Sequence, residues 1–208
     1  MSEKRMLSID PANQNPRDVY KLLIGSVLPR PIAFVSTVDK NNVRNLAPFS
    51  FFTVASSNPP VVVFCASVPA NERAMKDTLR NVMETREFVV NIVSEDFAEQ
   101  MNRCSATVPP EMDEFALSGL TPVASELVKP ARVAESHVQM ECRLLQVVTV
   151  SEKPMGGNLV LGEVLRFHVA KDVVTNFQID PEKLCAIGRM AGAWYCRTTD
   201  RFELRRPD

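Results

Sequence analysis

The stretch that decides the fold runs from Pro29 to Thr53 and reads PRPIAFVSTVDKNNVRNLAPFSFFT. Residues 32–38 and 43–54 are rich in the β-branched and aromatic side chains that favour strands. Residues 39–42 (DKNN) between them have turn chemistry, because Asp and Asn side chains bond to the nearby backbone. The sequence therefore predicts a β-hairpin that carries hydroxyls and amides among its apolar side chains.

Pro48 interrupts the second of these strands. A proline cannot donate to a strand ladder, so a central, fully paired position is disfavoured and a bulge or a sheet edge is expected. Bulges often re-aim side chains beside binding sites. We therefore expect Pro48 to break the ladder and free the backbone from Asn45 to Ser50 for a ligand.

Outward from this hairpin, most of the chain has strand patterns. An Asn15-Pro16 start predicts a first helix, and only two further helices are indicated. Many strands with few helices indicate a mainly β fold, a closed antiparallel barrel with helices packed outside it. The predicted strands cover residues 61–66, 87–93, 138–150 and 158–169, and the predicted helices cover 17–24, 79–86 and 94–104, the last capped by the hydroxyl of Ser94.

The 208 residues suit a single domain that spans the whole chain, residues 1–208. A formal net charge of -1 provides no field that attracts nucleic acid or an anionic membrane. Residues 1–16 lack an apolar leader, and no run of about 18 apolar residues occurs. We expect a cytoplasmic protein with no membrane segment.

Signatures of familiar catalytic sites are missing. The five cysteines are scattered and only two histidines accompany them, so no metal site is expected. The G-x-S-x-G, P-loop, G-x-G-x-x-G and H-E-x-x-H patterns do not occur. His137 and His168 both lie in predicted strands, which favours a structural or surface imidazole over a hydrolytic triad.

Two features suit a phosphorylated, planar ligand. Lys76, Asp77 and Thr78 stand where a helix begins, which is either an anion site or an ordinary solvated cap. The polar residues of the hairpin, Ser36 and Asn45 among them, either contact a flavin ring, with its polar edge and apolar faces, or occupy the outer face of a sheet. The residues alone leave both alternatives open.

Several segments, in this order, resemble the flavin reductase-like family of FMN-binding split-barrel proteins, which includes flavoredoxin-like members. The resemblance extends over about residues 18 to 205, and the ordered set is more specific than any one segment. The segments are 29–37 (PRPIAFVST), 45–52 (NLAPFSFF), 76–78 (KDT), 87–91 (EFVVN), 113–115 (DEF), 119–121 (GLT), 161–164 (LGEV) and 189–192 (RMAG).

The resemblance implies a six-stranded Greek-key split barrel, a homodimer, and one FMN per subunit near the dimer interface. Ala191 departs from the family, in which a second glycine is usual. Carried over to this chain, the ring contacts would be Ser36, Thr37, Val38, Asn45, Leu46, Ala47 and Pro48; the phosphate and ribityl contacts Ser50, Ser67, Lys76 and Thr78, with Arg30 nearby; and the residues that close the site Asn102, Arg103, Ser105 and the 189–195 loop with Arg189 and Trp194.

The resemblance also implies a reaction, in which NADH or NADPH gives hydride to the FMN. The chemistry then belongs to the cofactor, so no catalytic side chain is required. A partner oxygenase or another electron acceptor would take the electrons. The alternatives are a protein that carries FMN as a relay without nicotinamide turnover, and an oxidoreductase that resembles pyridoxamine-phosphate oxidases.

Overall fold

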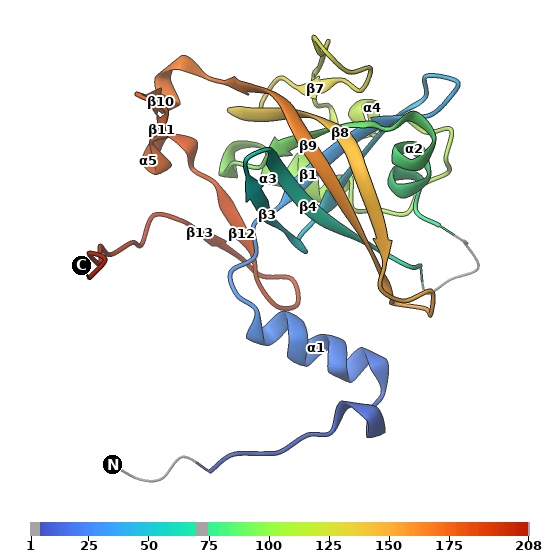
Figure 1. The fold of residues 1–208 in the computed structure, drawn as a ribbon, viewed down its shortest axis with the longest axis vertical. Coiled ribbons are helices and arrows are strands. Elements are labelled where there is room, and N and C mark those ends of the chain that lie inside the picture. Colours follow the sequence, from blue (N-terminus) through green and yellow to red (C-terminus); the bar gives the residue numbers. More distant parts are fainter. Residues whose placement is uncertain (1–4, 70–74, 208) are drawn as a thin grey trace.

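The computed structural model describes residues 5–69 and 75–207. Within these residues, seven strands form one antiparallel sheet in the order β2-β1-β5-β8-β9-β4-β3 (Figure 1). The mainly β prediction is confirmed. The strands are β1 (Ala33–Val38), β2 (Arg44–Phe49), β3 (Phe52–Ser57), β4 (Pro60–Ser67), β5 (Glu87–Ile92), β8 (Val138–Thr149) and β9 (Gly157–Val169).

The predicted hairpin is confirmed as β1 and β2, which pair from Ala33↔Phe49 to Val38↔Arg44. The single strand predicted over residues 43–54 is wrong. The chain bends at Ser50, and β3 then pairs with β4 at the other end of the sheet. The sheet consequently has seven strands rather than six, and its ladder does not close between β2 and β3.

Pro48 does not interrupt the ladder, contrary to the prediction. It pairs opposite Phe34 in an unbroken register. The N–H of Leu46 points away from β1, since it donates to the carboxylate of Glu114. Backbone groups two residues apart on a strand point the same way, so the missing donor of Pro48 falls on the free edge of β2. The alternative expectation, a sheet edge, is confirmed.

The sheet wraps around one apolar core and carries a second on its outer face. Phe49, Phe64 and Phe88, from three different strands, belong to the interior cluster. Phe34 and Leu46 point outward and pack beneath the helices in the second cluster. Both faces of the β1–β2 hairpin are therefore covered, which explains why every residue of β1 is buried.

The helices lie around the barrel. In α1, the side chain of Asn15 accepts from the N–H of Arg17, as predicted for its cap. The predicted cap of Ser94 is wrong, because its hydroxyl makes no cap hydrogen bond and the segment starts as a 3-10 turn. The helical segments are η1 (Pro11–Asn13), α1 (Pro16–Ser26), α2 (Asp77–Thr85), η2 (Glu95–Phe97), α3 (Ala98–Arg103), α4 (Glu114–Ser118), η3 (Lys171–Val173) and α5 (Pro181–Leu184).

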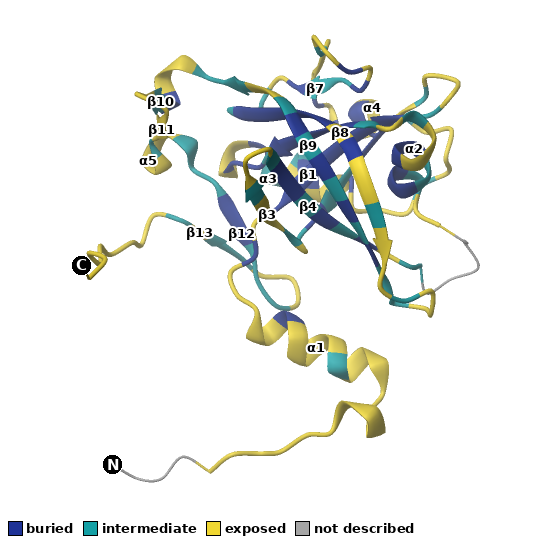
Figure 2. Ribbon diagram, viewed as in Figure 1, coloured by how far each residue is buried: buried dark blue, intermediate teal, exposed yellow. Residues whose placement is uncertain are grey.

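Three short strand pairs complete the fold, and the last of them lies next to the end of α1 (Figure 1). Helix α1 itself is set apart from the barrel and is almost entirely exposed (Figure 2). The pairs are β6 (Pro122–Val123) with β7 (Arg132–Val133), β10 (Val174–Thr175) with β11 (Gln178–Ile179), and β12 (Ile187–Arg189) with β13 (Tyr195–Arg197).

Candidate functional site

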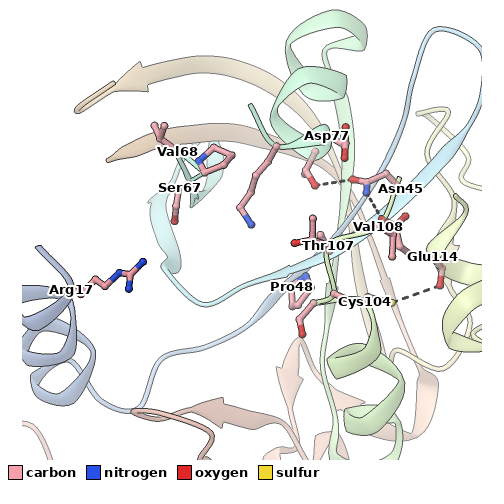
Figure 3. Close-up of a pocket in the computed structure, with 16 residues that line it drawn as sticks. Arg17, Asn45, Pro48, Ser67, Val68, Asp77, Cys104, Thr107, Val108 and Glu114 are labelled. Atoms are coloured by element: carbon pink, nitrogen blue, oxygen red, sulfur yellow. Dashed lines mark hydrogen bonds between the residues drawn. The ribbon is translucent and has the colours of Figure 1, made fainter. Parts of the chain in front are cut away.

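A cavity of about 630 Å³ opens where the edge of β2 meets the start of α2. The end of β4 and residues 104–108, which follow α3, form further walls (Figure 3). Such a volume lies within the usual range for small-molecule sites, about 300–1,000 Å³. Three of the segments that the sequence analysis singled out, around Asn45, Ser67 and Lys76, therefore line one cavity.

Lys76 supplies a cationic group to this cavity. Its backbone caps α2, and its ammonium lies 5.8 Å from the centre of the Phe49 ring. Burial lowers the pKa of Lys76, and the neighbouring charge of Asp77 partly offsets this. Among the residues that the structure describes, the ammonium has no hydrogen-bond partner. It is therefore available to an anionic ligand.

Arg17 is a second cation of the cavity. It comes from the first turn of α1, and its guanidinium points toward the cavity from the side opposite Glu114 (Figure 3). The two cations give one part of the cavity a positive potential, which suits a phosphate.

Asn45 lies at the centre of a buried hydrogen-bond network at the other end of the cavity. Its Oδ1 accepts from the hydroxyls of Thr78, at 2.7 Å, and Thr37, at 3.2 Å. Its Nδ2 donates to Oε1 of Glu114 at 2.8 Å. The amide of Asn81 donates in turn to Thr37 at 3.1 Å. Every member is buried, so the network fixes the side chain of Asn45.

Two titratable groups beside this network have shifted pKa values. Burial raises the pKa of Glu114, although the N–H groups of Leu46 and Asn45 that donate to it act in the opposite direction. Burial also raises the pKa of Cys104 to about 11. Cys104 is consequently a thiol at neutral pH and a poor nucleophile. The cavity thus contains a cationic end and an amide end, and its cysteine is not an activated nucleophile.

The structure brings some of the sequence-predicted residues to the cavity and not others. Ser36 is fully buried on the outer face of β1, where its hydroxyl donates to the carbonyl of Ala131. Leu46 and Val38 are buried as well, and Thr37 lies behind Asn45. The predicted residues that line the cavity are Asn45, Ala47, Pro48, Ser67, Lys76, Thr78 and Ser105.

Arg30 and Ser50, which were also predicted to bind the cofactor, contact each other and are not part of the cavity lining. The guanidinium of Arg30 donates to the carbonyls of Ile24 and Val27, at the end of α1, and of Met190. Its Nε donates to the hydroxyl of Ser50 at 3.4 Å. With four of its N–H groups engaged, Arg30 joins α1 to the C-terminal hairpin.

Of the residues predicted to close the site, Ser105 lines the cavity, whereas Asn102, Arg103, Arg189 and Trp194 are not part of its lining. The hydroxyl of Tyr195 donates to Oδ1 of Asn102 at 3.2 Å, and the guanidinium of Arg189 stacks 4.5 Å from the Tyr195 ring centre. Trp194 is 77% exposed, and Arg103 is exposed at the end of α3. This group connects α3 with the β12–β13 hairpin.

Arg17, Cys104 and Glu114 line the cavity but were not predicted from the sequence. Glu114 was noted only within a resembling segment, and its position depends on a contact with β2 that no local pattern indicates. Within residues 5–69 and 75–207, no cluster of His, Cys, Asp and Glu is suited to a metal ion, and no helix is long and apolar enough to cross a membrane.

Comparison with known proteins identifies the family of the chain. The profile described as "Flavin reductase like domain" matches residues 24–188. Nitrilotriacetate monooxygenase component B from Bacillus cereus is 40% identical, with a TM-score of 0.92 over 97% of this chain and 100% of that one. The 2-nitrobenzoate 2-nitroreductase NbaA of Pseudomonas fluorescens is 29% identical, with a TM-score of 0.87 over 97% and 96%.

A protein with a split barrel domain from Shewanella frigidimarina has the same fold, with a TM-score of 0.81 over 94% of this chain and 96% of that one at 21% identity. The barrel whose strands β2 and β3 do not pair is thus a split barrel. The chain belongs to the flavin reductase-like family, and the resemblance in its sequence segments is confirmed. Membership of this family implies a flavin ligand.

Proposed function

We propose that this protein binds FMN and acts as an NAD(P)H-dependent flavin oxidoreductase. The proposal rests on the cavity beside β2, which combines a fixed amide at Asn45 with the ammonium of Lys76, for which the described residues provide no hydrogen-bond partner. A phosphate needs the first group and the polar edge of a flavin ring needs the second. Family membership implies a flavin, FMN follows from the resemblance to FMN-binding split-barrel proteins, and the cavity offers a place for its ring and its phosphate.

The residues of the cavity fit such a ligand. Lys76 and the hydroxyl of Ser67 would hold the phosphate, with Arg17 nearby. Asn45, Ala47 and Pro48, along the free edge of β2, would lie against the ring. Bound FMN supplies hydride acceptance and release. The protein contributes binding, orientation and a preorganised set of donors.

We also propose a homodimer. Helix α1 and the residue that follows it expose several large apolar side chains, and the hydrogen bonds from Arg30 hold this segment to the barrel near the C-terminal end of the helix. A second copy that covers this helix would bury them. The side chains concerned are Tyr20, Leu22, Leu23 and Val27, which are 44–59% exposed. Light scattering on the purified protein should give twice the mass of the 23.2 kDa chain, and the mass of one chain would refute the dimer.

The electron acceptor is proposed from the comparison with a solved structure. Because a structure with 40% identity is named a monooxygenase component B, we propose a partner oxygenase as the acceptor of electrons or of reduced flavin. The second candidate remains an FMN-carrying relay protein that does not turn over nicotinamide.

Two measurements separate these proposals. A purified protein that is yellow and releases FMN, rather than FAD, on denaturation supports the cofactor. When the FMN-loaded protein is mixed with NADH or NADPH in the absence of oxygen, the absorbance band of oxidised flavin should disappear rapidly. Bound FMN that neither nucleotide bleaches would favour the relay.

A further inference from the structure

Two glutamates are buried among the described residues, and they are buried for different reasons. Glu141 accepts from the N–H groups of Glu126 and Leu127 and lies 2.6 Å from Nε2 of His168. It fastens the 124–130 segment to β8 and lies outside the cavity. Glu114, 6% exposed, lines the cavity instead. Burying a carboxylate costs free energy unless hydrogen bonds or opposite charges offset the lost hydration. The position of Glu114 beside a ligand site therefore suggests a role for it there.

The contacts of Glu114 determine how Asn45 is oriented. One carboxylate oxygen accepts from Nδ2 of Asn45 at 2.8 Å, and the other accepts from the N–H of Leu46 at 3.1 Å. A carboxylate can only accept, so the NH₂ group of Asn45 must face it. The Thr37 and Thr78 hydroxyls then donate to Oδ1. The second N–H of this amide has no partner among the described residues, and Asn45 lines the cavity.

In its ionised form, which the N–H groups of Leu46 and Asn45 favour against the effect of burial, Glu114 places a negative charge at the end of the cavity away from Arg17 (Figure 3). Two other carboxylates, Asp77 in the cavity lining and Asp113 next to Glu114 in sequence, are bound to cations: Asp77 pairs with Arg80 at 2.7 Å, and Asp113 pairs with Arg44 at 3.2 Å. Among the described residues, the carboxylate of Glu114 accepts hydrogen bonds only from neutral N–H groups. Its charge is therefore the least compensated of the three.

We infer that Glu114 is a positioning residue with a redox role: it holds an N–H of Asn45 toward the flavin and its charge disfavours the reduced, anionic ring. This inference rests on the proposed function. A fixed anion beside a group that gains negative charge raises the free energy of the charged form. Glu114 would thereby weaken the binding of reduced FMN relative to oxidised FMN and favour transfer of electrons onward.

The variant E114Q tests the inference, and E141Q is its matched control. Both replace a buried glutamate that accepts backbone N–H groups, but only Glu114 lines the cavity. The dissociation constants of oxidised and reduced FMN are measured without oxygen. For E114Q, the ratio of reduced to oxidised Kd should fall about tenfold, which corresponds to a rise of about 30 mV in the potential of bound FMN for a two-electron couple. For E141Q, the ratio should equal that of the wild type.

If E114Q does not fold, the variant E114D tests the inference instead. Aspartate keeps the negative charge but has a shorter side chain, so the hydrogen bond to Asn45 is lost. We expect both Kd values to rise by the same factor, about tenfold, with an unchanged ratio. An unchanged ratio in E114Q, an equal change in E141Q, or unaltered affinity in E114D would overturn the inference. A wild type that binds no FMN would instead refute the proposed function.

Discussion

The hydroxyl of Thr78 lies 2.7 Å from Oδ1 of Asn45, so the first turn of α2 is tied to the edge strand β2. The two residues are 33 positions apart in sequence. Because Lys76 precedes this turn, the same contact sets the distance between the cationic and amide ends of the cavity. The relative placement of these two ends therefore depends on a buried hydrogen bond.

Replacing Thr78 with valine should loosen this connection. The variant keeps the shape of the side chain but leaves Oδ1 of Asn45 with the longer bond from Thr37 alone. We expect a loss of about 1–2 kcal/mol in the free energy of unfolding and several-fold weaker FMN binding. T78S retains the hydroxyl and should bind FMN as the wild type does. Urea unfolding and flavin fluorescence titration measure the two effects, and equal behaviour of T78V and T78S would contradict them.

Replacing Lys76 with alanine should weaken FMN binding about ten- to a hundredfold, the usual value of a charge-assisted hydrogen bond. Riboflavin, which lacks the phosphate, should lose little affinity. K40A, in the exposed turn between β1 and β2, is the matched control and should bind FMN normally. Fluorescence titration with both flavins checks this. An unchanged FMN affinity in K76A would exclude Lys76 from the phosphate site.

Gly162 should not tolerate a side chain. A Cβ there would lie 2.7 Å from Cε1 of Phe88, whose ring is fully buried in the barrel interior. G162A should therefore lower the free energy of unfolding by about 1–3 kcal/mol. Gly25, inside α1, has no atom within 4 Å of its Cβ position, so G25A should instead raise it by about 0.5–1 kcal/mol. Denaturant unfolding of the pair tests the packing; a stable G162A would contradict it.

Glu141 should make stability depend on pH. Burial alone raises the pKa of Glu141, but the N–H groups of Glu126 and Leu127 and the ring of His168 outweigh it and lower the pKa below 4.5. A carboxyl group whose pKa is lower in the folded than in the unfolded state stabilises the fold at pH values above its unfolded-state pKa. This stabilisation is lost as the pH falls through the folded-state pKa. The stability difference between wild type and E141Q should therefore be constant near neutral pH and shrink below about pH 4.5. A difference that does not change with pH would be contrary to this account.

The sequence predicts the elements whose signals are local. The β1–β2 hairpin follows from two strand patterns and a DKNN turn, and the start of α1 follows from Asn15 and Pro16. The cap predicted at Ser94 fails, because that residue instead bridges to Ala186 and its hydroxyl finds no partner within the described residues. A local preference was overridden there by a tertiary contact.

The remainder depends on contacts between distant segments. The apolar run that follows Phe49 gives no sign of the bend at Ser50, which the pairing of β3 with β4 imposes. Glu114 reaches Asn45 across 69 positions, so no spacing or motif could assign it to the site. The free edge at Pro48 was foreseeable from the chemistry of proline, but the unbroken register was not.

The most direct test of the central claim is anaerobic reduction of the FMN-loaded protein by NADH or NADPH, followed at the absorbance band of oxidised flavin. We predict that at least one nucleotide bleaches the band rapidly, and that oxygen or another acceptor restores it. Persistence of the band with both nucleotides, while FMN stays bound, would contradict the assignment of this protein as an NAD(P)H-dependent flavin oxidoreductase.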